Sequence, residues 1–386
     1  MGISEMKVSV LGYGTVGKGV CDMIERTPGL ELGPVLVLHS ERSESFMITD
    51  IDEILKDSTV GAVVEAIGGE SPAGSFAERT LKAGKHFVTS NKAMVADRGI
   101  ELSALARSTG KAFLFSAACG GGIPFLHNLS VARKSDDILS MSGILNGTTN
   151  YVLDMMQSKG VPLDTALSQA RRLGYAEADP SADISGLDSY RKIILACAVA
   201  YGIQPEGYKD IEGIAGFTQQ DAEVISRRGA EVRLIASGGL NGDGSVYAFV
   251  EPRVFFDGME RAVRKNFNSV SYTGRNSGLI TYSGQGAGRY PTASAVLRDL
   301  TGIEEGTLYM LPAECVRRPA VNDMEERYLV RCEASQKDRF ITEEVWSEEG
   351  GTAVFVTGPM EVSRMHSLAA ELRNSGQGIF FASLGD

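Results

Sequence analysis

The sequence predicts an α/β domain at the N-terminus, then an α+β domain, then a small α+β segment. Two observations lead to this fold class. From residue 7 to about residue 117, apolar runs alternate with helical stretches, which is the pattern of a parallel sheet covered by helices. Beyond residue 202 the apolar runs are short and separated by turn residues, which is typical of a mostly antiparallel sheet. A chain of 386 residues suits two or three domains.

The first strand, expected at residues 7–11, runs directly into the glycine turn GYGTVG, and a helix follows to about Arg26. This order places backbone N–H groups and a helix N-terminus where a pyrophosphate can bind, so it favours a dinucleotide site over a merely tight turn. The residues expected to contact the dinucleotide are Gly12, Gly14, Thr15, Val16 and Gly17.

The second strand, PVLVL, ends in the segment HSERSES. His39 or Ser40 occupies the position at which many NAD-binding folds place a carboxylate for the ribose. Arg42 follows closely and suits a 2′-phosphate, which favours NADP, although two nearby glutamates keep NAD open. The alternative is a solvated, charged loop.

The alternation continues through residues 60–67, 76–83 and 86–89 and reaches SNKAMVA. Lys92 therefore lies just beyond the carboxyl end of a strand, where ligands bind in open α/β sheets. A lysine at this position is also compatible with a simple surface charge.

A further helix at residues 100–109 and a strand at 112–117 lead into the segment CGGGIPFL. Its glycines, Gly120 to Gly122, permit a close backbone approach or the coordination of an ion by carbonyl groups. The alternative is a flexible turn before a helix that begins near Pro124.

Between residues 145 and 195 lie the side chains that most resemble reactive groups. The turn NGTT caps one helix, a second helix follows, and an acidic loop leads to a long apolar helix from Leu187. Asp188 and Lys192 lie one turn apart on one face of this last helix. Such a pair can be a surface ion pair, but the apolar flank IILAC predicts burial, and a buried lysine needs a partner.

Downstream, the sequence predicts short strands near residues 232–236, 246–250 and 278–282. A second glycine-rich turn, SGQGAGRY, contains Gly286 and opens a helix at about Pro291; it is placed to approach a nucleotide from the opposite side. The final segment is expected to form three strands, a helix at residues 362–374 and a last strand.

The composition argues against several classes of protein. The net charge of −11 and the lack of a basic block argue against a nucleic-acid partner. The five cysteines and four histidines are scattered, which argues against disulfides, a metal cluster and a serine or cysteine nucleophile. No apolar run reaches about 18 residues and no secretory signal opens the chain, so we expect no membrane span and a cytoplasmic location.

Six segments across about residues 6–300 closely resemble homoserine dehydrogenase: VLGYGTVGKGV, VTSNKAMVA, GGGIPFL, LNGTTNYVL, GYAEADPSADISGLDSYRK and GQGAGRYPTASAV. The resemblance implies NAD(P)-dependent interconversion of L-homoserine and L-aspartate 4-semialdehyde by hydride transfer, in threonine and methionine biosynthesis. It also implies a Rossmann domain followed by a substrate domain that forms a homodimer. The alternatives are another Rossmann dehydrogenase of amino-acid metabolism and a catalytically silent nucleotide-binding regulator.

The resemblance also assigns roles to matching residues. Lys192 matches the proposed proton donor and Asp188 its carboxylate partner on the helix. Glu177 matches a substrate ligand, and Lys92 matches the lysine between cofactor and substrate. Hydride arriving at the aldehyde carbon leaves charge on oxygen, so a nearby ammonium group both stabilises that charge and supplies the proton. Glu177 and Asp188 are expected to orient the cationic amino group of the substrate, and Asp183 is expected either to hold the substrate or to shape the loop.

Two departures from the family qualify these implications. Ser116 stands where the family generally has a glutamate that helps to bind a monovalent cation, so backbone carbonyls of Cys119, Gly121 and Ile123 are left as sodium ligands of lower expected affinity. The tail lacks the DxPG turn of an ACT regulatory domain and passes from one strand directly into the next. We therefore expect a shortened ACT-like module, with weak or no inhibition by threonine.

The expected domains follow from these assignments. Residues 1–145, with about 286–320 returning to them, form the Rossmann domain; residues 146–285 form the substrate and dimerisation domain; and residues 321–386 form the shortened ACT-like module.

Overall fold

A computed structural model describes residues 5–69 and 71–385. The chain divides into two compact units. The first unit comprises Met1–Asp137, Ile194–Gln204 and Gly284–Arg317, and the second comprises Ile138–Ile193, Pro205–Ser283 and Arg318–Asp386.

The first unit contains a six-stranded parallel sheet in the order β3-β2-β1-β4-β5-β6. Its strands are β1 (Met6–Leu11), β2 (Leu30–Leu36), β3 (Met47–Ile48), β4 (Val60–Glu65), β5 (His86–Thr89) and β6 (Phe113–Leu114). The apolar side chains of β1 and β4 are buried, as expected for strands covered on both faces. This strand order is that of a doubly wound dinucleotide-binding sheet, so the Rossmann-like fold class is confirmed.

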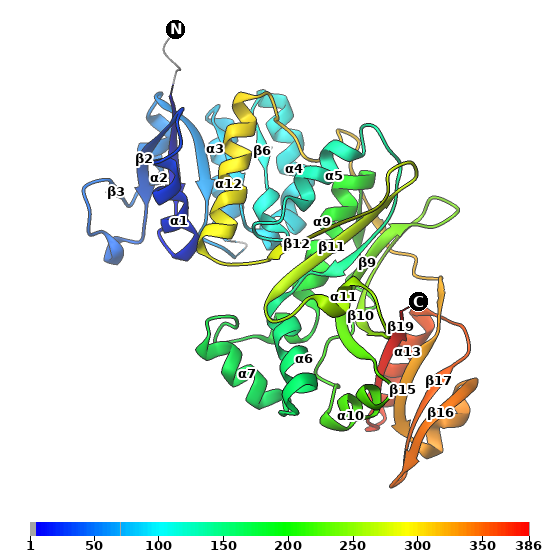
Figure 1. Ribbon diagram of the computed structural model, residues 1–386. Coiled ribbons are helices and arrows are strands. Elements are labelled where there is room, and N and C mark those ends of the chain that lie inside the picture. The colour runs from blue at the N-terminus through cyan, green and yellow to red at the C-terminus, as the bar shows by residue number, and fades with distance from the viewer. Residues whose placement is uncertain (1–4, 70, 386) are drawn as a thin grey trace. The chain divides into compact units, whose positions relative to one another are not determined.

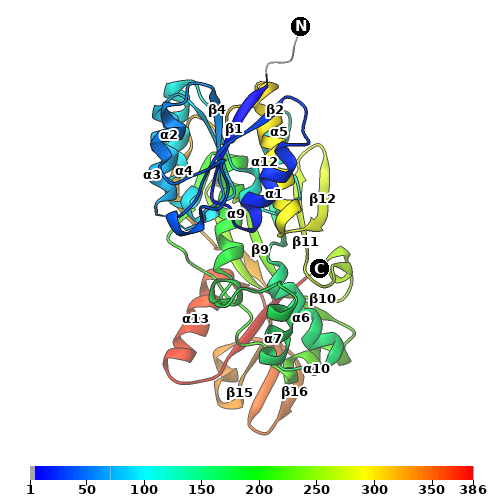
Figure 2. The ribbon, with the colours of Figure 1, turned by 90° about the vertical axis from the view of Figure 1, so that its left-hand side faces the viewer.

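Helices cover both faces of this sheet (Figure 2). They are α1 (Thr15–Ile24), α2 (Ile51–Lys56), α3 (Ala73–Lys82), α4 (Lys92–Thr109), α5 (Phe125–Ala132) and α12 (Arg289–Glu304). Although α12 comes from far along the chain, it returns to pack along α1 (Figure 1). The approach is close, because a Cβ atom on Gly19 would lie 2.8 Å from the carbonyl oxygen of Arg289.

The second unit is built on a nine-stranded mixed sheet in the order β12-β11-β7-β9-β10-β19-β15-β17-β16. The strands are β7 (Ile138–Ile144), β9 (Glu231–Leu240), β10 (Val246–Phe255), β11 (Phe267–Gly274), β12 (Gly278–Gln285), β15 (Tyr328–Glu333), β16 (Thr342–Glu349), β17 (Thr352–Thr357) and β19 (Phe380–Leu384). The helices are α6 (Gly147–Lys159), α7 (Leu163–Arg172), α8 (Ser181–Ile184), α10 (Gln219–Arg227), α11 (Met259–Ala262) and α13 (Val362–Asn374), and α9 (Leu187–Tyr201) begins here. Short paired strands complete the chain: β8 (Ile203–Glu206) pairs with β13 (Val316–Pro319), and β14 (Glu325–Glu326) pairs with β18 (Met360–Glu361).

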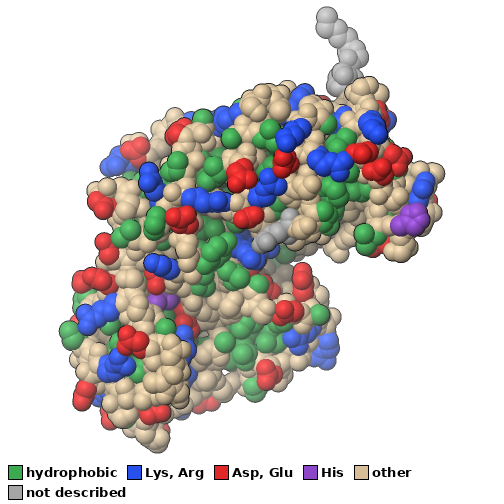
Figure 3. Space-filling model, turned by 180° about the vertical axis from the view of Figure 1, so that it is seen from behind, with side chains coloured by type: hydrophobic (Ala, Val, Ile, Leu, Met, Phe, Trp, Pro, Cys, Tyr) green, Lys and Arg blue, Asp and Glu red, His purple; other side chains and the backbone are tan. Residues whose placement is uncertain are grey.

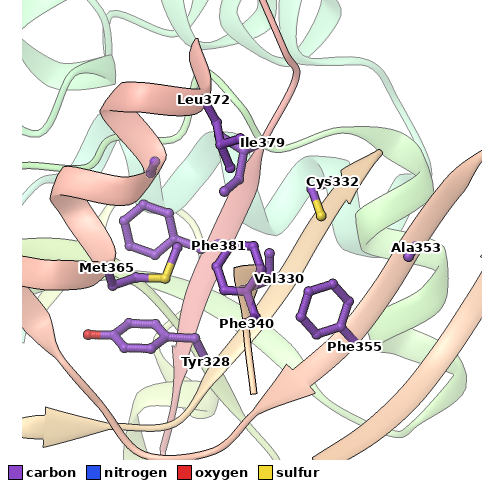
Figure 4. Close-up of a cluster of buried hydrophobic side chains, with 11 residues drawn as sticks. Tyr328, Val330, Cys332, Phe340, Ala353, Phe355, Met365, Leu372, Ile379 and Phe381 are labelled. Carbon is purple, nitrogen blue, oxygen red and sulfur yellow. The ribbon is translucent and has the colours of Figure 1, made fainter. Parts of the chain in front are cut away.

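In the tail of the chain, α13 packs against the strands β15, β17 and β19 around a cluster of buried side chains (Figure 4). The cluster is rich in aromatic residues, including Tyr328, Phe355 and Phe381. Its last strand also pairs in parallel with β10, through Arg253 with Ser383, so the tail continues the large sheet. The α+β character of the tail is therefore observed, while its likeness to an ACT domain stays a prediction.

Three local expectations were wrong. The segment at residues 112–117 is not one strand, because a 3₁₀ helix (Ser116–Ala118) follows β6. The passage from β15 to β16 is not direct, since a 3₁₀ helix (Ala334–Arg339) intervenes. The helix expected at residues 100–109 begins earlier, at Lys92, because Asn91 caps it.

The described surface carries charges of both signs. On the face shown in Figure 3, lysine and arginine side chains are interspersed with aspartate and glutamate. Among residues 5–69 and 71–385, no helix is both long and apolar enough to cross a membrane.

Candidate functional site

The glycine turn between β1 and α1 brings backbone segments close together at two of its glycines. Gly12 has a φ of +96°, and a Cβ atom there would lie 2.9 Å from the carbonyl oxygen of Ala66. A Cβ atom on Gly17 would lie only 2.0 Å from the carbonyl oxygen of Gly12. At Gly14, which precedes α1, a Cβ atom would meet none of the described atoms within 4 Å. Thr15 and Val16 begin α1 directly after this turn, so pyrophosphate binding by the first N–H groups of the helix stays a prediction.

The loop after β2 lies on the surface. A 3₁₀ helix spans His39–Glu41, and Ser40 and Arg42 are exposed. The Arg42 guanidinium group is therefore accessible to a ligand, and a ribose phosphate is one anion that it suits.

Lys92 is the first residue of α4 and is half-buried. Asn91, just before it, caps the helix with its side-chain oxygen, which accepts a hydrogen bond of 3.1 Å from the backbone N–H of Met94. The start of this helix could have been predicted from the sequence, since asparagine is among the preferred N-cap residues.

Glu65, at the end of β4, was missed by the sequence analysis. Its carboxylate is fully buried and accepts hydrogen bonds from the backbone N–H groups of Ile67 and Gly68 and from the Thr89 hydroxyl group. A carboxylate within the otherwise apolar run VGAVVEAI was the available signal, because a buried charge needs partners.

In the second unit, the structure brings Asp188 and Lys192 together as their spacing predicts. The Lys192 ammonium group donates to Asp188 Oδ2 at 2.7 Å and to the carbonyl oxygen of Leu145 at 2.6 Å. Both side chains are buried, with 6% and 8% of their residue surfaces exposed. The ion pair is therefore shielded from water, unlike a typical surface pair.

Asn146 joins this pair to the acidic loop, a role that the sequence analysis did not assign. Its side-chain nitrogen donates to Asp183 Oδ1 at 2.7 Å and to Asp188 Oδ2 at 2.8 Å. Its side-chain oxygen accepts from the N–H of Thr149 at 2.8 Å and so caps α6. One buried amide therefore holds two carboxylates in place and starts a helix.

The acidic loop contributes carboxylates of unequal character. Burial and the neighbouring charge of Asp188 raise the pKa of Asp183, and the hydrogen bond from Asn146 partly offsets this rise. Asp179 shapes the loop, since it accepts from the N–H of Ser181 at the start of α8. Glu177 is exposed. Through Asn146, Asp183 is thus connected to the ion pair of Asp188 and Lys192, whereas the side chain of Glu177 is exposed to solvent.

The turn that precedes α5 packs tightly against the second glycine-rich segment of the first unit. Gly121 has a φ of +54°, and a Cβ atom there would lie 2.5 Å from the carbonyl carbon of Gly286. The thiol residue Cys119 is buried, and the carbonyl oxygen of Ile123 accepts from the N–H of Phe125 at 2.8 Å. Among the described residues, no three His, Cys, Asp or Glu side chains gather as metal ligands. Sodium binding by this turn stays a prediction.

Ser116 binds a carboxylate on α12. Its hydroxyl group donates to Asp299 Oδ1 at 2.5 Å and its N–H to Asp299 Oδ2 at 2.8 Å. Burial raises the pKa of Asp299 to about 7. A carboxyl group is therefore present beside Ser116, although residue 116 does not supply it.

Comparisons with known proteins show which proteins the chain resembles. A family model described as homoserine dehydrogenase matches residues 124–301, and one described as its NAD-binding domain matches residues 12–116. A homoserine dehydrogenase of Synechocystis sp. is 36% identical over 317 residues, which cover 77% of this chain and 73% of that protein. An NAD(+)-dependent homoserine dehydrogenase of Pseudomonas canavaninivorans is 38% identical over 66% of this chain and 74% of that protein. A crystal structure of a homoserine dehydrogenase from Thiobacillus denitrificans has a TM-score of 0.88 at 27% identity and covers 100% of this chain and 99% of that chain.

Proposed function

We propose that this chain, which belongs to the homoserine dehydrogenase family and interconverts L-homoserine and L-aspartate 4-semialdehyde, prefers NADP and uses Lys192 as its acid–base group. The observation that supports this role is the buried contact of Lys192 with Asp188, which Asn146 also binds. A lysine held in this way has a fixed position, which proton transfer to a substrate oxygen requires.

The chemistry follows from the charges that the reaction creates. The nicotinamide cofactor, when bound, supplies or accepts the hydride. During reduction of the aldehyde, negative charge develops on its oxygen, and the Lys192 ammonium group stabilises this charge and donates the proton. In the oxidation of homoserine, the same nitrogen accepts the hydroxyl proton. Lys92 assists electrostatically from the start of α4, and Asp183 and Glu177 bind the cationic amino group of the substrate.

For the cofactor, we propose a preference for NADP. The exposed Arg42 follows a strand end that has His39 and Ser40 in place of a carboxylate, and a guanidinium group binds phosphate well. One relative is described as NAD(+)-dependent, so the ratio of the rates with NADP+ and NAD+ is the quantity to measure.

We also propose a homodimer formed by the second unit. Large apolar side chains are exposed near the β12 edge of its sheet: Leu279 on β12 is 59% exposed, and Phe267 on β11 is 40% exposed. Apolar surface beside an open sheet edge favours association with a second copy. Light scattering on a sizing column would show a mass of twice 41.2 kDa, and a monomer would contradict the proposal.

One assay tests the reaction and its main residue. We expect wild type to reduce NADP+ in the presence of L-homoserine, and Lys192→Ala to lower kcat by at least about 100-fold, because general acid–base catalysis typically contributes this much. Lys159→Ala is the matched control, since Lys159 ends α6 in the same unit and is exposed. Equal rates for wild type and Lys192→Ala would contradict the mechanism.

The same assay separates the remaining alternatives. Replacing NADP+ by NAD+ measures the cofactor preference, and replacing homoserine by other hydroxy amino acids detects a different dehydrogenase. Adding millimolar threonine tests the tail: we propose that the shortened ACT-like module lacks an effector site, so the rate should change little. Strong inhibition would contradict that proposal.

A further inference from the structure

Glu65 is a buried carboxylate for which the proposed mechanism has no use. None of its surface is exposed, and it ends β4 in the first unit. Its Oε1 atom accepts from the N–H groups of Ile67 at 2.7 Å and Gly68 at 2.9 Å. Burying a carboxylate costs free energy unless hydrogen-bond donors surround it. We therefore expect the hydrogen bonds of Glu65 to fix the backbone that donates them.

Thr89 is the side-chain partner of this carboxylate. Glu65 and Thr89 are opposite each other in the parallel pairing of β4 with β5, so their side chains leave the same face of the sheet. The Thr89 hydroxyl group donates to Glu65 Oε2 at 2.6 Å and accepts from the backbone N–H of Asn91 at 2.9 Å. It is also completely buried.

Asn91 extends these contacts to the start of α4. Its side-chain oxygen caps the helix through the N–H of Met94, and its side-chain nitrogen donates to the carbonyl oxygen of Gly69. The loop after β4 and the helix start are thus connected through three side chains. Lys92 is the next residue, so its backbone is fixed by the same contacts.

We propose that Glu65, Thr89 and Asn91, which we call the Glu65 network, are positioning residues that fix Lys92 for the reaction. The inference rests on the proposed function, since it assumes that Lys92 acts near the substrate. A carboxylate that accepts from three donors fixes the loop after β4 and the end of β5 more firmly than a neutral acceptor would.

The loop held by Glu65 also supports the glycine turn. Ala66, directly after Glu65, packs its carbonyl oxygen against Gly12, where a Cβ atom would come within 2.9 Å. The N–H of Ala66 also donates to the carbonyl oxygen of Leu11 at 2.9 Å. The network therefore connects the backbone beside the expected pyrophosphate position to the lysine that begins α4.

Removal of the Thr89 hydroxyl group tests the network with little change in shape. We expect Thr89→Val to lower kcat at least about 10-fold, because a small misplacement of a reacting group is costly. Thr89→Ser, which keeps the hydroxyl group, should retain most of the rate. Thr80→Val is the matched control, because Thr80 is equally buried and its hydroxyl group has no hydrogen-bond partner among the described residues. It should stay within about twofold of wild type.

A double-mutant cycle asks whether the effect passes through Lys92. We expect Lys92→Ala to lower kcat, and the further change Thr89→Val to alter it less than about twofold. Equal losses from Thr89→Val with and without Lys92 would overturn the network as a positioning device. A wild-type rate for Lys92→Ala would instead refute the role of Lys92 in the proposed function.

Hydrogen exchange gives a second readout that needs no activity. In Thr89→Val, amides at residues 66–69 and 91–95 should exchange faster than in wild type, whereas in Thr80→Val they should not, because Thr80 bonds neither segment. Unchanged exchange in both segments would overturn the network even if the rate fell. Faster exchange with an unchanged rate would show that the network holds the backbone without serving Lys92, which would also overturn the proposal.

Discussion

Asn146→Ala should lower both the stability of the fold and the rate of the reaction, because the Asn146 side chain makes four hydrogen bonds. It removes the cap of α6 and the donors to Asp183 and Asp188. Loss of a cap costs about 1 kcal/mol. Loss of a hydrogen bond to a buried charged group costs about 1.5–3 kcal/mol, which applies to Asp188, while water can replace the donor at the half-buried Asp183. We expect the free energy of unfolding to fall by about 3 kcal/mol.

Urea denaturation measures this loss, and the control is Thr218→Ala. Thr218 caps α10 in the same unit, so its replacement should cost about 1 kcal/mol and leave the contact between Asp188 and Lys192 unchanged. The rate of homoserine oxidation should fall at least about 10-fold in Asn146→Ala, because Asp188 and Lys192 lose their alignment. A stability loss no larger than that of the control, together with a wild-type rate, would refute the reasoning.

The stability loss in Asn146→Ala should also depend on pH. The Asn146 donor holds down a pKa that burial and Asp188 raise at Asp183, so its removal raises that pKa further. A carboxyl group with a raised pKa in the folded state binds its proton more tightly there than in the unfolded chain. The contribution of Asp183 to stability is therefore greatest below the unfolded pKa of about 3.9 and falls as the pH rises toward the folded pKa. The difference between wild type and variant should be larger at neutral pH than at pH 4, and a larger difference at pH 4 would contradict this.

Other substitutions test other parts of the molecule. Gly17→Ala should abolish nucleotide binding, measured by NADPH fluorescence, because its Cβ atom would lie 2.0 Å from a backbone oxygen. Gly14→Ala is the control and should leave the melting temperature nearly unchanged. Equal effects of the two substitutions on folding would contradict this geometry. Asp299→Asn should change the pH dependence of stability. The contribution of Asp299 to stability is full below about pH 4 and is lost as the pH rises to about 7, because burial disfavours the ionised carboxylate. Parallel urea midpoints for both proteins across this range would refute the assignment. Arg42→Ala should raise KM for NADP+ several-fold and leave KM for NAD+ unchanged, and equal changes for both cofactors would exclude a contact with the 2′-phosphate.

The parts of the fold that sequence analysis predicted are those with strong local patterns. The strand His86–Thr89 and the helix Val362–Asn374 were predicted to the residue, because apolar spacing marks both clearly. The strand Phe267–Gly274 was missed, since its sequence FNSVSYTG is rich in small polar residues. Its pairing with β7, more than a hundred residues earlier, stabilises it, and such a partner leaves no local signal.

The same distinction applies to the candidate site. The contact between Asp188 and Lys192 was predictable because helical spacing places residues four apart on one face. The contacts of Asn146 join residues 37 and 42 positions apart, and those of Glu65 with Thr89 span 24 positions. Tertiary packing creates these contacts, so the local sequence showed the polar residues without their partners.

The place of β19 in the second unit has a consequence for the synthesis of the chain. This strand, Phe380–Leu384, lies between β10 and β15, so it connects five strands on one side with three on the other. The five strands from β7 to β12 can pair while the ribosome is still translating the rest, but the full sheet must wait for residues 380–384. Until then β10 and β15 both have an unpaired edge open to other chains. Slow translation or removal of these few residues would therefore expose the middle of the sheet to aggregation.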